Sequence, residues 1–326
     1  MKKVIILLLV FLGVGIGLAL RFWPENKEMV SPLGKFQSPQ EKPLQKYSFP
    51  NLNQRGGISS QIAIGEALKQ EGKFTSYLFS YTSEGRKITG LFNQPVGEGN
   101  FPVIIMLRGW VDQEVYQTGV GTQRAGEVFA QNGFITLAPD FLGYAGSDNP
   151  PDDVWEERFL KPVAVLDLLA SIKSLPQADV KKIGFWGHSN GGMIALSVLE
   201  ITGADYPTAL WAPVSKPFPY DILFYTDEYE DKGKLLRAKL ADFEKDYDVD
   251  QYSFDRYLDW LKAPLQIHQG KADDAVPLEW TNELVDRLEE LKIDVNYYVY
   301  PGADHNMSGS WDQVVSRDLN FFREKL

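Results

Sequence analysis

Apolar and polar positions along the chain predict strands and helices in turn. The stretch 74–95 alternates around Ser83-Glu84-Gly85, which predicts a β-hairpin. Short apolar runs rich in β-branched residues predict buried strands at 101–107, 133–139, 182–186, 265–268 and 295–300. Helical spacing lies between some of these runs, at about 122–131 and 163–174. This alternation predicts an α/β fold, with a mainly parallel sheet covered by helices on both faces.

The first 23 residues follow a different pattern. Lys2 and Lys3 precede an uncharged apolar run from Val4 to Leu20, which is followed by Arg21 and two aromatic residues. A basic flank before such a run is typical of an export signal. We expect segment 1–23 to be a membrane anchor that holds an exported catalytic domain in the cell envelope. Cleavage of the segment as a signal peptide, giving a secreted protein, is the alternative.

The rest of the chain divides at about residue 55. Scattered prolines among Lys, Glu, Gln and Ser predict a tether over 24–55. No repeat or long low-complexity tract follows, so 56–326 is expected to form one domain.

Composition narrows the possible partners and chemistry. Acidic residues outnumber basic ones by 44 to 33, giving a net charge of -11, which argues against nucleic acid. The chain has no cysteine, which excludes disulfides, thiolate metal sites and a cysteine nucleophile. Neither a metal nor an organic cofactor is implied by any motif, and no pattern indicates an oligomeric state.

A serine lies between glycines where the 182–186 strand gives way to helical spacing, in Gly187-His188-Ser189-Asn190-Gly191. A tight strand-to-helix turn pushes such a serine hydroxyl into the crevice at the carboxyl end of a parallel sheet, and glycines remove the collisions. The pattern predicts that Ser189 is a nucleophile.

A serine nucleophile needs a base and an orienting carboxylate, which follow it in the order acid, histidine in this type of fold. The chain has three histidines. His188 adjoins the nucleophile on the turn and His268 precedes the acid site, so both are expected to have packing roles. His305 follows the last expected strand and is the predicted base. Asp273 and Asp274, on the loop after the 265–268 strand, are the candidate acids.

Together these motifs resemble the catalytic domain of prolyl oligopeptidase-type (S9) peptidases, a family that includes dipeptidyl and acylaminoacyl peptidases. The resemblance rests on "GHSNGG", "GKADDAVP" and the "DH" about 32 residues later, and spans about 74–326. It implies that the first acid of the pair, Asp273, is catalytic. Asp140, in "PDFLGYAGSD", is expected to be structural.

The oxyanion hole is expected to use two backbone N–H groups, those of Asn190 and Trp110. Family members usually carry His-Gly where this chain has Arg108-Gly109. Arg108 could serve instead as a structural ion-pair partner.

The family's propeller needs several hundred residues, and we expect none here. An insertion at about 214–262 is expected to form a lid beside the site. The resemblance implies a serine hydrolase that cleaves aminoacyl or acylaminoacyl peptide bonds through an acyl-enzyme. A carboxylesterase acting on small acyl esters is the alternative, and an inactive binding module is the third hypothesis. The substrate-binding residues are not identified by the sequence.

Overall fold

The structure is a computed structural model that describes residues 42–326. The predicted anchor, residues 1–23, lies outside this part of the chain. No helix of 42–326 is both long and apolar enough to cross a bilayer.

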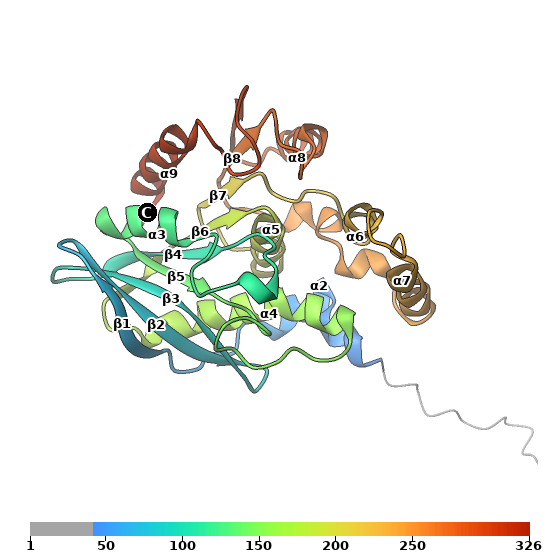
Figure 1. The fold of residues 1–326 in the computed structure, drawn as a ribbon, viewed down its shortest axis with the longest axis horizontal. Coiled ribbons are helices and arrows are strands. Elements are labelled where there is room, and N and C mark those ends of the chain that lie inside the picture. Colours follow the sequence, from blue (N-terminus) through green and yellow to red (C-terminus); the bar gives the residue numbers. More distant parts are fainter. Residues whose placement is uncertain (1–41) are drawn as a thin grey trace, which may run out of the picture. The chain divides into compact units, whose positions relative to one another are not determined.

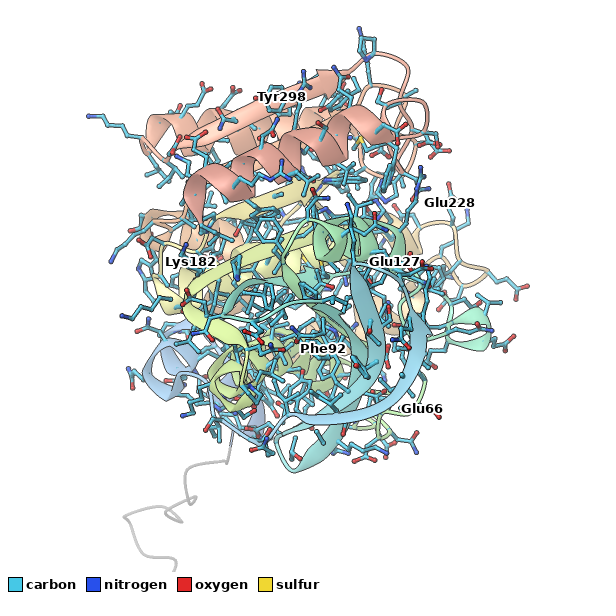
Figure 2. The ribbon with its side chains drawn as sticks, turned by 90° about the vertical axis from the view of Figure 1, so that its left-hand side faces the viewer. Glu66, Phe92, Glu127, Lys182, Glu228 and Tyr298 are labelled. Carbon is cyan, nitrogen blue, oxygen red and sulfur yellow. The ribbon has the colours of Figure 1, made fainter. Side chains whose placement is uncertain are left out.

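Residues 42–326 contain nine strands that form one sheet in the order β1-β2-β3-β5-β4-β6-β7-β8-β9. The strands are β1 (Ala63–Gln70), β2 (Phe74–Ser83), β3 (Arg86–Pro95), β4 (Phe101–Leu107), β5 (Ile135–Pro139), β6 (Ala178–His188), β7 (Thr208–Trp211), β8 (Leu265–Gly270) and β9 (Val295–Tyr300). β5, β4, β6, β7, β8 and β9 pair in parallel, whereas β1, β2, β3 and β5 pair antiparallel. Figure 2 shows the two edges, with Glu66 on β1 far from Tyr298 on β9.

Helices cover both faces of the sheet. They are α2 (Phe49–Arg55), α3 (Gln123–Gln131), α4 (Val154–Ser171), α5 (Asn190–Thr202), α6 (Tyr220–Thr226), α7 (Lys234–Asp246), α8 (Leu278–Glu290) and α9 (Trp311–Lys325). Buried side chains of α3 and α9 share one apolar core, and those of α2, α4, α5 and α8 share the other. Figure 1 shows this arrangement, which confirms the predicted fold class.

Three expectations about individual elements are corrected by the structure. The expected tether is wrong over its last residues, because the 3₁₀ helix η1 (Pro43–Tyr47) and α2 bury Leu44, Tyr47 and Phe49 in the core. Residues 43–55 therefore belong to the folded domain. β1 was not predicted, because almost all of its residues are exposed and give no alternating pattern. α4 begins nine residues before the expected start, because Pro162 lies inside this helix.

The segment between β7 and β8 forms α6, α7 and a series of short 3₁₀ turns. It packs against α4 through aromatic rings, with Phe218 5.5 Å from Trp155 and Phe243 5.8 Å from Phe159 between ring centroids. The Tyr225 hydroxyl on α6 donates to the Ala275 carbonyl at 3.0 Å. The expected insertion is thus a folded layer that reaches the loop after β8 (Figure 1).

Candidate active site

Ser189 occupies the sharp turn between β6 and α5. Its backbone has φ 55° and ψ -121°, a conformation that residues with side chains rarely adopt. Gly191 makes the turn possible, because a Cβ there would lie 2.0 Å from the Leu107 carbonyl oxygen. A Cβ at Gly187 would likewise lie 2.8 Å from the Gly191 carbonyl oxygen. The two glycines therefore have the steric role that the sequence predicts.

His305 and Asp273 meet at the carboxyl ends of β8 and β9. The His305 Nδ1 lies 2.9 Å from Oδ2 and 3.1 Å from Oδ1 of Asp273. Gly270, the last residue of β8, admits the histidine loop, because a Cβ there would lie 2.4 Å from the Ala303 carbonyl oxygen. Asp274 is exposed and makes no hydrogen bond or ion pair within residues 42–326. The structure thus pairs His305 with the first acid and not with the second.

The Asp273 carboxylate is fully buried and held by several donors. Its Oδ1 accepts from the backbone N–H groups of Ala275 at 2.9 Å and Val276 at 2.8 Å, and its Oδ2 from Gln269 Nε2 at 2.9 Å. Burial acts to raise the pKa of Asp273, but the hydrogen bonds and the charge of His305 outweigh it and keep this pKa below 3.8. The carboxylate is therefore ionised at neutral pH, and it fixes the proton of His305 on Nδ1. Nε2 is left free to accept a proton.

Ser189 and His305 adjoin each other through His188. The His188 Nε2 donates to the His305 carbonyl at 2.9 Å, and the two imidazole rings lie 4.7 Å apart. In the part of the chain that the structure describes, the Ser189 hydroxyl makes no hydrogen bond to His305, and such bonds often tighten only when substrate binds. His188 thus packs as expected, but it also holds the histidine loop against the nucleophile turn.

The expected oxyanion donors also lie at this turn. A Cβ built on Gly109 would lie 3.0 Å from the Ser189 Cβ, so the loop after β4 is in contact with the nucleophile. The N–H groups of Trp110 and Asn190 have no hydrogen-bond partner within residues 42–326. The Asn190 N–H is the first of α5, where the helix dipole adds positive potential.

Arg108 fixes the backbone of this loop and does not face the site. Its Nη1 donates to the Gly109 carbonyl and its Nη2 to the Asp140 carbonyl, both at 2.9 Å. The guanidinium lies 4.0 Å from the centre of the Tyr144 ring and 4.4 Å from that of Tyr116. The alternative role of Arg108 as a structural ion-pair partner is not found within residues 42–326, where its partners are carbonyl groups and aromatic rings.

Asp140 has the structural role that was expected. Its carboxylate accepts from the Tyr116 hydroxyl at 2.7 Å, the Thr89 hydroxyl at 2.6 Å and the Thr118 hydroxyl at 2.9 Å. Burial raises the pKa of Asp140, and these hydrogen bonds limit the rise. Asp140 therefore anchors the loop that also binds Arg108.

His268 lies in a buried network outside the site. Its Nε2 lies 2.9 Å from Asp318 Oδ1, and its Nδ1 lies 2.8 Å from the Tyr300 hydroxyl. The other oxygen of Asp318 accepts from Trp211 Nε1 at 2.6 Å. Both members of this second His–Asp pair are fully buried, which fits the packing role expected for His268.

No pattern in the sequence indicated the contact of His188 with the histidine loop. The cage around Arg108 was partly visible, because an arginine directly after a buried strand needs partners there. Among residues 42–326, no three His, Asp or Glu side chains converge in a way that could hold a metal ion.

A parallel sheet with a serine elbow and a His–Asp pair at its carboxyl edge defines an α/β-hydrolase. Residues 123–326 match the model of the prolyl oligopeptidase family, Peptidase_S9. The chain belongs to this family, and it is a serine hydrolase.

Three similar proteins illustrate the range of the relatives. The uncharacterized peptidase YtmA of Bacillus subtilis is 25% identical over 252 residues, which cover 74% of this chain and 91% of YtmA. The acylaminoacyl peptidase of Pyrococcus horikoshii has a TM-score of 0.59 at 19% identity, covering 79% of this chain and 42% of that one. Acetyl xylan esterase 1 of Thermoanaerobacterium sp. JW/SL YS485 has a TM-score of 0.63 at 16% identity, and the match covers 86% of this chain and 94% of the esterase. The two structural likenesses show the fold.

Proposed function

We propose that Ser189, His305 and Asp273 form a catalytic triad that cleaves acyl bonds through an acyl-enzyme. The observation that carries this proposal is the buried Asp273 carboxylate on His305 Nδ1, beside a serine at positive φ. Ser189 Oγ attacks the substrate carbonyl carbon while His305 Nε2 takes its proton. Asp273 holds the imidazole tautomer and stabilises the imidazolium that forms.

The tetrahedral intermediate places a negative charge on the former carbonyl oxygen. We assign its stabilisation to the N–H groups of Trp110 and Asn190, which are unpartnered within the described residues and flank Ser189. Collapse of the intermediate breaks the bond to the leaving group, which receives the proton from His305. Water then attacks the acyl-enzyme by the same route and releases the acid, restoring Ser189.

Peptide bonds are the proposed substrate class. The family match supports an aminoacyl or acylaminoacyl peptidase, as does the likeness to proteins named as peptidases. A carboxylesterase is the second candidate, because the same machinery hydrolyses esters and the fold extends over nearly the whole of an acetyl xylan esterase. Esters have the better leaving group and need less transition-state stabilisation.

The insertion between β7 and β8 is the proposed lid. α6 contacts the loop that carries Asp273 through the Tyr225 hydroxyl, and it exposes Tyr220 by 60% and Phe224 by 46%. Exposed aromatic side chains beside the acid loop could cover an apolar acyl group. No substrate-binding residue is assigned beyond this surface.

A matched substrate panel tests the proposed reaction. Aminoacyl arylamides and aryl esters with the same acyl group should both be hydrolysed, with kcat/KM higher for the esters. Robust ester cleavage without measurable amide cleavage would move the assignment to carboxylesterase. Failure of both classes, with a folded enzyme, would contradict the hydrolase proposal.

A further inference from the structure

A hollow of about 730 Å³ adjoins the candidate active site on the face of the sheet that α3 and α9 cover. It lies among the first turns of these helices, the ends of β6 and β7, and the loop after His305. His188, which precedes the nucleophile in the chain and contacts His305, lines the hollow. The volume is in the range of pockets that bind small ligands.

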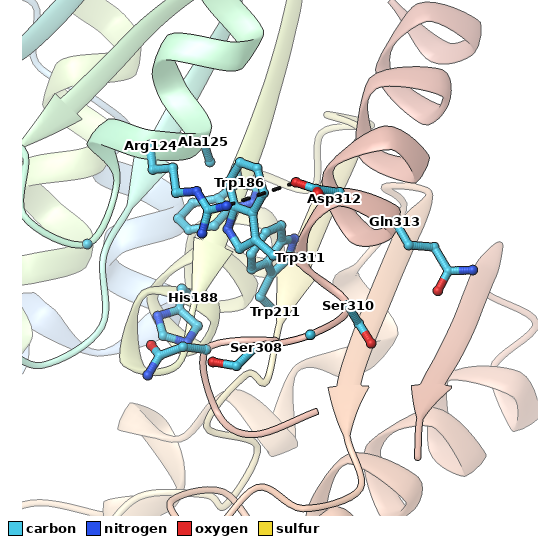
Figure 3. Close-up of a pocket in the computed structure, with 13 residues that line it drawn as sticks. Arg124, Ala125, Trp186, His188, Trp211, Ser308, Ser310, Trp311, Asp312 and Gln313 are labelled. Atoms are coloured by element: carbon cyan, nitrogen blue, oxygen red, sulfur yellow. Dashed lines mark ion pairs between the residues drawn. The ribbon is translucent and has the colours of Figure 1, made fainter. Parts of the chain in front are cut away.

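Three tryptophan side chains form an aromatic floor. The rings of Trp186 and Trp211 lie 5.2 Å apart and those of Trp211 and Trp311 lie 6.1 Å apart, all in edge-to-face contact. Figure 3 shows the three indoles grouped together, with Arg124 on one side and Asp312 on the other. An apolar or aromatic group would find a complementary surface here.

Hydrogen-bond donors converge above this floor. α3 and α9 both begin at the hollow, and neither Thr122 nor Ser310, their N-cap residues, makes a side-chain cap. The first N–H groups of both helices, in 123–125 and 311–313, therefore include donors without a partner in residues 42–326. Both helix dipoles place positive potential at this point.

The Trp186 side chain adds an independent observation. Trp186 is 2% exposed and lines the hollow, yet its Nε1–H has no hydrogen-bond partner in the described chain. Buried N–H groups without a partner are rare, and an acceptor on a ligand would satisfy this one.

Arg124 supplies the positive charge of the hollow. Its guanidinium lies 3.5 Å from the centre of the Trp311 ring, and Nη2 lies 3.9 Å from Asp312 Oδ1. Both members of this ion pair are largely exposed, so the pair holds Arg124 only weakly. Arg124 is thus able to turn toward an anion in the hollow.

We infer that the hollow binds the leaving-group half of a peptide substrate that ends in a free α-carboxylate. The carboxylate would accept from Trp186, Arg124 and the helix N-termini, and an apolar side chain would lie on the indoles. His305 gives its proton to the leaving amine, and the hollow begins one side chain beyond it, at His188. An extended residue advances about 3.3–3.6 Å, so a leaving dipeptide is long enough to pass the His188 side chain and enter the hollow. The inference rests on the proposed function, and it names a product class that simple esters do not supply.

Matched peptides test the inference during turnover. Two acyl dipeptides with the same leaving Phe-Phe group, one with a free carboxylate and one with a carboxamide, should differ about tenfold in kcat/KM in favour of the acid. Arg124→Gln should reduce this ratio to about threefold or less. Arg323→Gln, at the far end of α9, makes the same change of charge and should keep the parent ratio. Equal rates for the two peptides, or an unchanged ratio in Arg124→Gln, would overturn the inference.

Equilibrium binding separates this site from the proposed reaction. In a Ser189→Ala background, free Phe-Phe and its C-terminal amide are titrated by calorimetry with tryptophan fluorescence as a second signal. Free Phe-Phe should bind at least fivefold more tightly than its amide. Trp186→Phe, which removes only the N–H and one ring, should weaken the binding of free Phe-Phe more than the binding of the amide. Selective binding without peptide hydrolysis would retain the site and reject the peptidase proposal. No binding, or equal binding of the two forms, would reject the site.

Discussion

At Ser189 the backbone takes a conformation that only close contacts on both sides can maintain. Its N–H donates to the Trp211 carbonyl at 2.9 Å, and its carbonyl accepts from the N–H groups of Gly192 and Val214. The glycine spacing and the strand before it made this residue predictable from the sequence. His305 was predictable as well, because the chain has three histidines and only one follows a strand in the required order. The contact of His188 with the histidine loop joins chain segments far apart in the sequence and was not predictable, whereas the need of Arg108 for partners was partly predictable.

Arg108 is linked to the proposed oxyanion donor Trp110 through one peptide unit. A trans peptide points its C=O and N–H in opposite directions, so the hydrogen bond to the Gly109 carbonyl also orients the Trp110 N–H. We predict that Arg108→Met lowers kcat by about tenfold to a hundredfold with little change in KM. Arg108→Lys, which keeps the charge but lacks the fork of donors, should recover only part of kcat. Steady-state kinetics on an aryl ester measures both constants, and a parental kcat in Arg108→Met would refute this role.

His188 makes the stability of the fold dependent on pH. Its burial, together with the neighbouring His305, lowers the pKa of His188 from 6.5 to about 4. Below pH 6.5 His188 therefore binds a proton in the unfolded chain but not in the folded protein. As the pH falls from 6.5 to about 4, the free energy of unfolding decreases. In His188→Asn the free energy of unfolding should decrease less over this pH range, by up to about 3 kcal/mol, because each unit of pKa shift corresponds to about 1.4 kcal/mol. Urea unfolding at pH 7, 5.5 and 4 measures it, and parallel curves for parent and variant would contradict the assignment.

The strands and helices that the sequence pattern predicts are those with one or two buried faces. The expected ranges of β4 and β9 agree with the structure, because their apolar runs end at turn residues. β1 and α2 were not predicted, each for its own reason. β1 is an exposed edge strand without alternation, and α2 buries only two apolar residues next to a proline. Local patterns carry little information about elements that depend on tertiary contacts.

α5 carries a buried acid that the proposed mechanism does not use. Both carboxylate oxygens of Glu200 lack a partner in residues 42–326, and burial raises the pKa of Glu200 well above 4.5, with Asp255 and Asp259 adding to the rise. The folded protein therefore retains a proton that the unfolded chain loses above pH 4.5, so this group lowers the free energy of unfolding as pH rises. Glu200→Gln removes the titration.

The stability difference between Glu200→Gln and the parent should thus shift in favour of the variant by at least about 1 kcal/mol between pH 5 and pH 8. Comparing the two proteins at each pH removes any constant packing cost of the substitution. A difference that stays constant from pH 5 to pH 8 would show that Glu200 ionises in the folded state.

For the whole molecule, the apolar run near the amino terminus predicts where the enzyme acts. We propose that segment 1–23 anchors the exported catalytic domain to the membrane, on the basis of two lysines followed by 17 apolar residues from Val4 to Leu20. Fractionation of cells that express the full chain should recover it in the membrane fraction. A shortened form outside the cytoplasm would favour cleavage instead, and full-length protein in the soluble cytoplasmic fraction would exclude both outcomes.

The central claim is that Ser189 is the nucleophile of an acyl-enzyme. A fluorophosphonate should add one group per chain, and mass spectrometry should place that group on the peptide that contains Ser189. Ser189→Ala should not be labelled, should lose about 10⁴ to 10⁶ in turnover, and should unfold at the temperature of the parent. Labelling of a folded Ser189→Ala variant at the parental rate, or an adduct on another serine, would contradict the account.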